Sequence, residues 1–295
     1  MTKLFILFFS VLLTFTACSS DSTQKKFEKE LKISTNAWIG YAPLFYAKEK
    51  GYLKKLNIKL ILNVSLSEAA DVYLVNDADM VTTTQHELHA IKKTVNDTVP
   101  IILLDRSDGG DMILSNKNLQ QIKNAKKVDA YLEINSINTN LLRDFIRFHK
   151  LDINKFSFIN KDQAEIQDLA PNSSKTMLIV TYSPYNVKLK KSGFLEISST
   201  KSLQELIVID SLCTHKKFLK TQKSRLKQLK AVIDNSIKEI QTDKKGSYKL
   251  IKRYLENISY TEYLKALDNI KWINHPSNKL LKRIKPIGYK REYLI

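Results

Sequence analysis

The chain has few of the residues that cross-link or interrupt a fold. Its 295 residues include two cysteines, Cys18 and Cys213, with seven glycines and six prolines. If Cys18 is consumed by the N-terminal chemistry argued below, no intrachain disulfide can form, so stability must come from burial of apolar side chains. The hydrophobic content of 43% is sufficient for such a core.

Long apolar runs are also missing after the first residues. No later stretch approaches 18 uninterrupted apolar residues, so the sequence predicts no transmembrane helix. It contains no Gly-rich phosphate loop and no Cys-x-x-Cys pair, and we expect neither a cofactor nor a metal. His86-Glu87-Leu88-His89 lacks the zincin spacing, and both histidines are interpreted as surface or core residues. Cys213 and His215, two residues apart, are not a catalytic dyad by spacing alone, so we expect no enzyme.

Arginine is scarce for so basic a protein. The net charge is +18, yet only seven of the 48 basic residues are arginines. Nucleic-acid readers rely on arginine for bidentate phosphate contacts. The charge is therefore interpreted as lysines on solvated faces, with anionic lipid headgroups as the alternative partner. No nucleic-acid partner is expected.

The first 30 residues have the pattern of an exported, lipid-anchored protein. Lys3 precedes an apolar run from Leu4 to Phe15, about a dozen residues and too short to span a bilayer of roughly 30 Å. Phe15-Thr16-Ala17-Cys18 follows and resembles a lipobox, although its first position is usually leucine. We predict a signal peptide at 1–17, lipidation of Cys18 and a flexible tether at 18–30. Ser19 leaves open which membrane holds the anchor.

The rest of the chain alternates β-prone runs with amphipathic helical stretches. The predicted strands are Ile33–Trp38, Ile58–Val64, Met80–Thr83, Pro100–Leu104, Met112–Ser115, Val128–Leu132, Phe156–Asn160, Met177–Thr181 and Glu205–Asp210. The predicted helices are Pro43–Lys50, Glu68–Val75, Gln85–Lys93, Leu119–Asn124, Asn138–His149, Asp162–Leu169, Lys216–Asp243, Ser247–Leu255 and Tyr260–Ile270. This order predicts an α/β fold with mostly parallel sheets.

Two such series of strands and helices, followed by a further strand and helices near the end of the chain, predict two lobes. We expect lobe 1 to comprise residues 31–106 and 205–295 and lobe 2 residues 107–204. The hinge crossings are expected near Asp105–Gly110 and Thr200–Leu206. Asp105 and Asp108 are interpreted as hinge carboxylates paired with Arg106.

Residues 38–52, WIGYAPLFYAKEKGY, resemble the opening signature of the solute-binding proteins of nitrate/sulfonate/taurine-type ABC transporters. Relatives of that family bind pyrimidine precursors of thiamine. Weaker matches follow in the same order: ADMVTTT at 78–84, LDRSDGGD at 104–111, NSIN at 135–138 and TYSPY at 181–185. The resemblance implies a type II periplasmic-binding-protein fold, with two α/β lobes, a hinge and a ligand cleft. Charged residues in this region, among them Arg106, Asp108 and Glu133, depart from the family pattern and leave the solute unidentified.

Each of these segments is a strand end that leads into a helix, where α/β folds bind ligands. Trp38, Gly40 and Tyr41 are expected to form an aromatic wall with close backbone approach. Pro43 is interpreted as a helix-start residue rather than a ligand contact. Hydroxyl, amide and aromatic groups from the other segments complete the predicted ligand-binding set: Thr83, Thr84, Ser136, Asn138, Tyr182 and Tyr185. Each has an alternative structural role, as core, turn or helix-capping residue.

Aromatic walls with helix N-termini favour a compact anion or a planar heterocycle. The resemblance implies an extracytoplasmic, monomeric receptor that delivers a sulfonate, nitrate or pyrimidine-like solute to an ABC permease and its ATPase, with the membrane contacted only through the lipid. The alternative is a sensory or scaffolding lipoprotein that uses the same fold to detect a ligand.

Overall fold

The computed structural model describes residue 27, residues 29–203 and residues 206–295. The predicted signal, Cys18 and most of the predicted tether fall outside these residues, so the expectations for them are not addressed by the structure. Within these ranges, no helix combines the length and apolarity needed to cross a bilayer.

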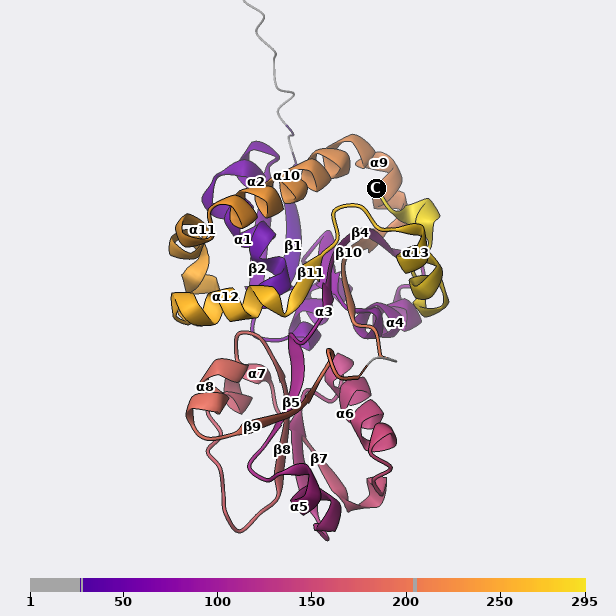
Figure 1. Ribbon diagram of the computed structural model, residues 1–295. Coiled ribbons are helices and arrows are strands. Elements are labelled where there is room, and N and C mark those ends of the chain that lie inside the picture. Colours follow the sequence, from indigo (N-terminus) through magenta and orange to yellow (C-terminus); the bar gives the residue numbers. More distant parts are fainter. Residues whose placement is uncertain (1–26, 28, 204–205) are drawn as a thin grey trace, which may run out of the picture.

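Two β-sheets define two lobes, one above the other in Figure 1. The sheet of the first lobe has the order β11-β4-β10-β3-β1-β2, and that of the second has the order β7-β6-β8-β5-β9. The strands of the first sheet are β1 (Leu31–Asn36), β2 (Ile58–Asn63), β3 (Met80–Thr83), β4 (Thr98–Ser107), β10 (Ile209–His215) and β11 (Ile270–Trp272). Those of the second are β5 (Asp111–Ser115), β6 (Val128–Leu132), β7 (Phe156–Asn160), β8 (Met177–Tyr182) and β9 (Leu195–Ser199).

Helices cover both sheets. The first lobe contains α1 (Ala42–Glu49), α2 (Tyr52–Lys55), α3 (Leu66–Leu74), α4 (Gln85–Thr94), α9 (Lys216–Thr221), α10 (Lys223–Thr242), α11 (Lys244–Ile251), α12 (Tyr260–Asp268) and α13 (Asn278–Ile284). The second contains α5 (Leu119–Asn124), α6 (Ile137–Phe148), α7 (Gln163–Ile166) and α8 (Asn186–Lys191). Single 3₁₀ turns are η1 (Ile39–Tyr41), η2 (Ile153–Lys155), η3 (Lys252–Tyr254), η4 (Lys285–Ile287) and η5 (Arg291–Tyr293).

The sheets are mixed, and the expectation of mostly parallel sheets is wrong. Strand β1 is parallel to β2 and β3, but β10 is antiparallel to β3 and β4, and β11 to β4. In the second lobe β6 is parallel to β7 and β8, whereas β5 is antiparallel to β8 and β9. The antiparallel strands β5 and β10 are those by which the chain enters one lobe from the other. A local βα pattern does not reveal their direction.

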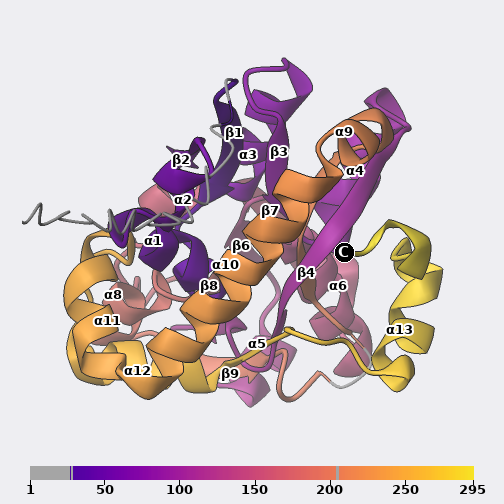
Figure 2. The same ribbon diagram turned by 90° about the horizontal axis from the view of Figure 1, so that it is seen from above.

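The long amphipathic helix α10 closes the top of the first lobe, and Figure 2 shows it crossing the molecule diagonally. Its buried stripe follows the predicted spacing and comprises Leu226, Leu229, Ile233, Ile237 and Ile240. The stripe packs with α1 in one core, and residues of α3, α4 and α13 form a second core of this lobe. The helix expected over Lys216–Asp243 is interrupted at Gln222, which has φ −107° and ψ 14°.

Other strands differ from the sequence prediction where the apolar pattern is short. The strand expected at Glu205–Asp210 is displaced: β10 begins at Ile209 and ends at His215, and Glu205 lies outside the described residues. Strands β9 and β11 were not expected from the sequence. Strand β9 begins with exposed residues, and β11 is only three residues long, so neither has a clear apolar pattern.

Hydroxyl side chains join the two crossings between the sheets. The chain leaves β4 at Ser107 and returns after β9 near Thr200, and the Oγ atoms of these two residues lie 2.8 Å apart. The Thr200 hydroxyl also accepts a hydrogen bond from the Gly109 amide at 2.8 Å. The Asp111 amide donates to Ser107 Oγ at 3.0 Å. The crossings are thus fixed side by side, where the lobes can pivot about them.

Candidate functional site

A small cavity lies where the two lobes meet. It measures about 10 Å³, roughly the space for one water molecule. Its lining comes from both lobes and comprises Asn36, Trp38, Leu66, Thr84, Asp111, Tyr182 and Asp210. Three of the nine residues predicted to bind ligand therefore meet here: Trp38, Thr84 and Tyr182.

Trp38 forms one wall of the cavity and is 4% exposed. Its indole Nε1 donates to the Asp105 carboxylate at 3.2 and 3.3 Å. Its ring contacts that of Tyr182 edge to face, with centroids 5.8 Å apart at 83°. Trp38 stands just before η1 in the first lobe and Tyr182 ends β8 in the second, so the pair spans the lobe junction.

Two glycines leave room for the Trp38 indole. A Cβ on Gly40 would lie 2.0 Å from Asp105 Oδ2 and 2.3 Å from Trp38 Nε1. A Cβ on Gly110 would lie 2.4 Å from Trp38 Cη2. Gly40 was expected to let the backbone approach a ligand. In the structure, the close approach at Gly40 is to the hydrogen-bonded Trp38–Asp105 pair.

Two further hydrogen bonds connect the buried aromatic and polar groups of the site. The Tyr41 hydroxyl donates to Asp210 Oδ1 at 2.6 Å, so Tyr41 contributes behind the cavity lining. The Asn36 side-chain amide donates to the Tyr182 hydroxyl at 3.1 Å, which joins β1 of the first lobe to β8 of the second. These contacts hold the rings and carboxylates in fixed positions.

Glu87 links the N-termini of two helices from different lobes. Its Oε2 accepts from the Thr84 amide at 2.9 Å and from the Thr84 hydroxyl, completing the cap of α4. Its Oε1 accepts from the Ile137 amide at 2.9 Å, at the N-terminus of α6. Glu87 is 1% exposed. The N-terminus of α6 therefore already holds a carboxyl group of the protein itself.

Further contacts close the lobes against each other. Asn140 Nδ2 lies 3.1 Å from His86 Nδ1. On the other side of the junction, Lys191 of α8 pairs with Glu262 of α12 at 2.8 Å. Together with the Glu87 bridge, these contacts describe a closed arrangement, so any solute larger than a water requires the lobes to separate before it can enter.

The remaining predicted ligand residues lie near the cavity but do not line it. The Thr83 hydroxyl contacts Cys213 Sγ at 3.2 Å. Ser136 caps α6, accepting from the Asn138 amide at 3.2 Å. Asn138 is fully buried, and its side-chain oxygen and nitrogen have no partner. Tyr185 packs edge to face behind Tyr182 with centroids 5.5 Å apart.

Buried carboxyl groups dominate the electrostatics of the junction. Burial raises the pKa of Asp111 to about 7, and Glu87 adds to the rise. Burial raises the pKa of Glu133 to about 8, again with Glu87 contributing. Burial also raises the pKa values of Asp105 and Asp210 well above the usual range, and the neighbouring aspartates raise them further.

The two predicted hinge carboxylates, Asp105 and Asp108, have different partners in the structure. Arg106 pairs with Asp108 at 3.3 Å, as the sequence analysis expected. The expected pairing of Asp105 with Arg106 is wrong, because Asp105 is fully buried beneath the Trp38 indole. Successive residues of a strand point to opposite faces, so Arg106 points away from this carboxylate.

The groups considered for nucleophilic catalysis are placed unfavourably for it. Cys213 is buried, and burial raises the pKa of its thiol to about 11, which disfavours the thiolate. His215 lies 3.1 Å from Asp97 and is not paired with the thiol. Among the described residues, no cluster of three or more His, Cys, Asp or Glu is suited to hold a metal.

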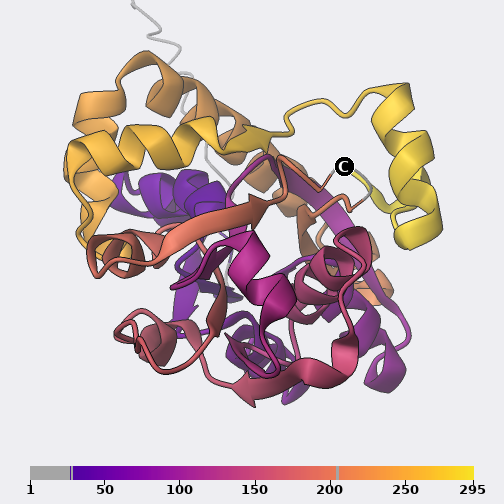
Figure 3. The ribbon, with the colours of Figure 1, turned by 60° about the horizontal axis from the view of Figure 1, so that its bottom comes forward.

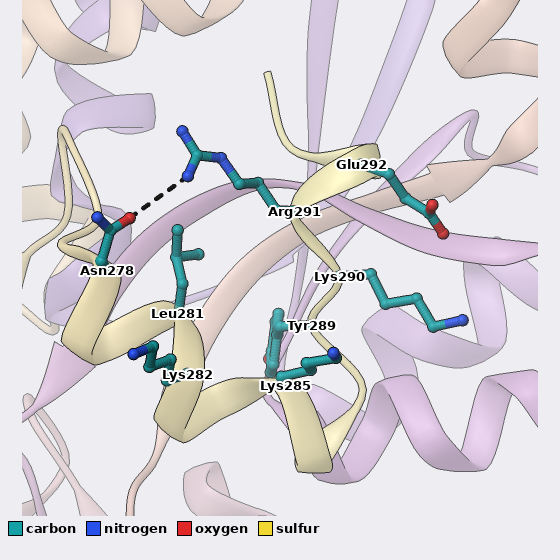
Figure 4. Close-up of a pocket in the computed structure, with 8 residues that line it drawn as sticks. All are labelled: Asn278, Leu281, Lys282, Lys285, Tyr289, Lys290, Arg291 and Glu292. Carbon is teal, nitrogen blue, oxygen red and sulfur yellow. Dashed lines mark hydrogen bonds between the residues drawn. The ribbon is translucent and has the colours of Figure 1, made fainter.

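A larger groove of about 570 Å³ lies beside α13 in the first lobe and is lined by residues 278–292. Figure 3 shows this C-terminal helix, in yellow, on the opposite side of the lobe from α11 and α12. Basic side chains line the groove, but Figure 4 shows Lys282 pointing away from Lys285 and Lys290. Their ammonium groups do not converge on one point, as an anion site would require.

Sequence reasoning missed the polar residues that complete the lining. Asn36, Asp111 and Asp210 were not predicted as site residues, and Glu87 was considered only in a catalytic role. Asp210 directly follows the apolar run Ile207-Val208-Ile209. A carboxylate in an apolar strand is rarely buried without a reason, and this was the available signal.

Comparisons with known proteins identify the fold. Residues 24–141 match the model of the NMT1-like family. A search of curated proteins gives no match. The chain resembles the ligand-binding component of an ABC-type import system from Staphylococcus aureus, solved with zinc bound (TM-score 0.70, 14% identity, 88% of this chain and 92% of that one).

Two further solved structures share the fold. One is the aliphatic sulphonate-binding protein SsuA from Escherichia coli (TM-score 0.70, 13% identity, coverage 89% and 86%). The other is the nitrate-binding protein NrtA from Synechocystis PCC 6803 (TM-score 0.62, 12% identity, coverage 79% and 68%). They agree with the resemblance to nitrate/sulfonate/taurine-type binding proteins. The described chain therefore has the two-lobed fold of periplasmic solute-binding proteins, and residues 24–141 carry the pattern of the NMT1-like family.

Proposed function

We propose that this protein is an extracytoplasmic, lipid-anchored solute-binding protein of an ABC importer. The observation that carries the proposal is the polar and aromatic cavity between two lobes connected by paired crossings. Trp38, Tyr182, Thr84, Asp111 and Asp210 would surround the solute, and contacts from both lobes would stabilise the closed state. No covalent chemistry is needed.

The other residues predicted to bind ligand lie around the cavity and would act in two ways. Gly40 and Tyr41 would hold Trp38 and Asp210 in place. Thr83, Ser136, Asn138 and Tyr185 would contact a solute only after the lobes shift. We retain 31–106 with 205–295 and 107–204 as the proposed lobe boundaries. The proposed partners are a membrane permease and its ATPase, with a monomeric receptor presented to them.

Loss of Trp38 is expected to abolish solute binding. A solute at about 100 times its Kd should raise the Tm of the wild type by about 5–10 °C in a thermal-shift screen of sulfonates, nitrate, amines and pyrimidines. Trp38→Ala should show no shift, because the wall facing Tyr182 is gone. If Trp38→Ala fails to fold, Trp38→Phe tests the same site, because it keeps an aromatic ring at this position.

Phe148→Ala is the matched control, since this aromatic residue is 62% exposed and lies on α6 away from the cavity. It should retain the full thermal shift. If no small solute stabilises the wild type but a partner protein does, the sensory or scaffolding alternative replaces the proposal. Turnover of a solute that depends on His86, Glu87 or Cys213 would instead indicate an enzyme.

Cys18→Ala is expected to release the protein from membranes. The lipid is the only proposed anchor, so most of the protein should move from the membrane to the soluble fraction of a cell lysate. A Ser19→Ala variant, one residue away, should stay in the membrane fraction. A Cys18→Ala protein that still sediments with membranes contradicts the lipid anchor.

A further inference from the structure

We propose that the cavity between the lobes takes a small planar organic cation that carries N–H donors, such as an amidinium or a protonated amino-heterocycle. This inference rests on the proposed function and names its class of solute. Of the two classes expected from the sequence, it retains the planar heterocycle and replaces the anion.

Unpartnered acceptors in the cavity lining are the first support. Asp111 Oδ2 and Asn36 Oδ1 have no hydrogen-bond partner, although both residues line the cavity and are 4% and 0% exposed. Buried polar atoms are nearly always hydrogen-bonded, so a group that belongs here must supply donors. Both atoms are acceptors, and they come from different lobes, so a solute with two N–H groups would join the lobes through them.

The charge around these acceptors is the second support. Asp105, Asp111 and Asp210 are buried within reach of each other's charge, and Glu87 acts on both Asp111 and Asp210. No lysine or arginine among the described residues forms an ion pair with these four carboxyl groups; the pairs found involve other acids. An uncompensated buried charge is costly, and a cation bound among them removes that cost.

The two aromatic rings favour an organic cation with a flat face. Trp38 and Tyr182 come from different lobes and contact each other edge to face at 83°, so a ligand that enters when the lobes separate is flanked by an indole and a phenol ring. Indole and phenol faces attract cations. Leu66 adds an apolar contact. A bare metal ion would gain nothing from these three side chains, and the described residues include no cluster suited to hold one.

An anion is disfavoured by the same groups. It would approach Asp111 and Asp210 directly, and the N-terminus of α6, which would otherwise attract it, is occupied by Glu87. Each of these carboxyl groups repels an anion whenever it is ionised, and the repulsion is strong in a poorly hydrated site. The acidic lining therefore selects against sulfonates and nitrate, even though proteins of this fold include binders named for both.

Proton release should accompany binding of the cation. Among the titratable groups that face Asp111, Glu87 on α4 raises the pKa of Asp111, and Asp111 in turn raises the pKa values of Asp105 on β4, Asp210 on β10 and Tyr182 on β8. Burial raises the pKa of Asp111 to about 7, so this carboxyl is partly protonated near neutral pH, whereas a bound cation favours its ionised form. Affinity should therefore rise between pH 6 and pH 8, and calorimetry in two buffers of different ionisation enthalpy should detect released protons.

The test is a calorimetric titration of the full chain with defined probes. The cationic probes with N–H donors are benzamidine and 4-aminopyridine. Choline is a cation without N–H donors, Ca²⁺ is an inorganic cation, and nitrate, methanesulfonate and taurine represent the solutes of other binding proteins. We expect a planar N–H cation to bind at least tenfold tighter than choline and the anions.

Asp111→Asn should weaken binding of that cation by at least about 30-fold, the usual loss when one member of a buried charge pair is removed. Asp129→Asn is the matched control: Asp129 is a buried aspartate of the same lobe that lies 3.6 and 3.7 Å from Lys127 and Lys175. This variant should bind as the wild type does, and circular dichroism confirms that both variants are folded.

Each alternative outcome has a defined meaning. Preferential binding of nitrate or a sulfonate, lost in Trp38→Ala, keeps the proposed function and overturns the cation inference. Equal binding of choline and 4-aminopyridine overturns the requirement for N–H donors, and preference for Ca²⁺ overturns the organic class. If no probe or other small solute binds, both the inference and the proposed function fail.

Discussion

Gly40→Ala is expected to lower the free energy of unfolding by about 2–3 kcal/mol, or the Tm by about 5–10 °C. The added Cβ would sit 2.0 Å from Asp105 Oδ2 and 2.3 Å from Trp38 Nε1. Both side chains are buried and hydrogen-bonded to each other, so neither can move aside into solvent. Solute affinity should fall at least tenfold, because Trp38 is displaced from the cavity wall.

Gly246→Ala provides a control with the same local geometry. Its Cβ would also lie 2.0 Å from a carboxylate oxygen, that of Asp243, but this side chain is exposed at the start of α11. Rotation of Asp243 away from the added Cβ weakens the N-cap of α11, which costs about 1 kcal/mol. Replacing a glycine inside a helix by alanine stabilises the helix by a similar amount and offsets this cost. Chemical unfolding of the two variants should separate them. Equal stability would show that the Trp38–Asp105 pair is not rigid.

The protein is expected to lose stability as the pH rises from 5 to 8. Asp111 and Glu133 keep their protons to about pH 7 and pH 8 in the folded state but release them near pH 4 when unfolded. Between these limits the native state binds more protons, so the free energy of unfolding falls with increasing pH. The loss should be on the order of 3–6 kcal/mol, since each pKa unit corresponds to about 1.4 kcal/mol.

Other titrating groups do not reverse this trend. The partly exposed carboxylates Glu49, Glu239 and Glu262 have lowered pKa values and act below about pH 4.5. His149 has a lowered pKa through burial, so its single contribution opposes the trend below about pH 6.5. Urea unfolding at pH 5, 6, 7 and 8 measures the slope. Asp111→Asn should flatten it and Asp129→Asn should not; a wild-type slope of zero would contradict buried, protonated carboxyl groups.

The sequence contains enough information to predict the fold class and one wall of the site. Trp38 and Tyr41 stand in a recognisable segment, and the helix that begins beside Pro43 forms as α1. Thr84 directly follows strand β3 and Tyr182 ends strand β8, so the rule that ligands bind at strand ends located them. Local patterns of this kind depend on neighbouring residues only.

The acidic character of the site could not be predicted in the same way. Asp111 begins β5, Asp105 lies near the end of β4 and Asp210 near the start of β10, and nothing local indicates that they converge. They meet because β10 returns from the second lobe and inserts antiparallel between β3 and β4. A motif search does not detect charge that the topology brings together, so the sequence predicted either an anion or a planar heterocycle as the solute.

The central claim is that the two lobes enclose one small solute against Trp38. The most direct measurement is the stoichiometry and affinity of solute binding by calorimetry on the full chain, with wild type and Trp38→Ala compared at the same pH. The account predicts about one solute bound per chain to the wild type and no detectable binding to the variant. Equal binding by a folded Trp38→Ala protein, or none by the wild type across all solute classes, would contradict it.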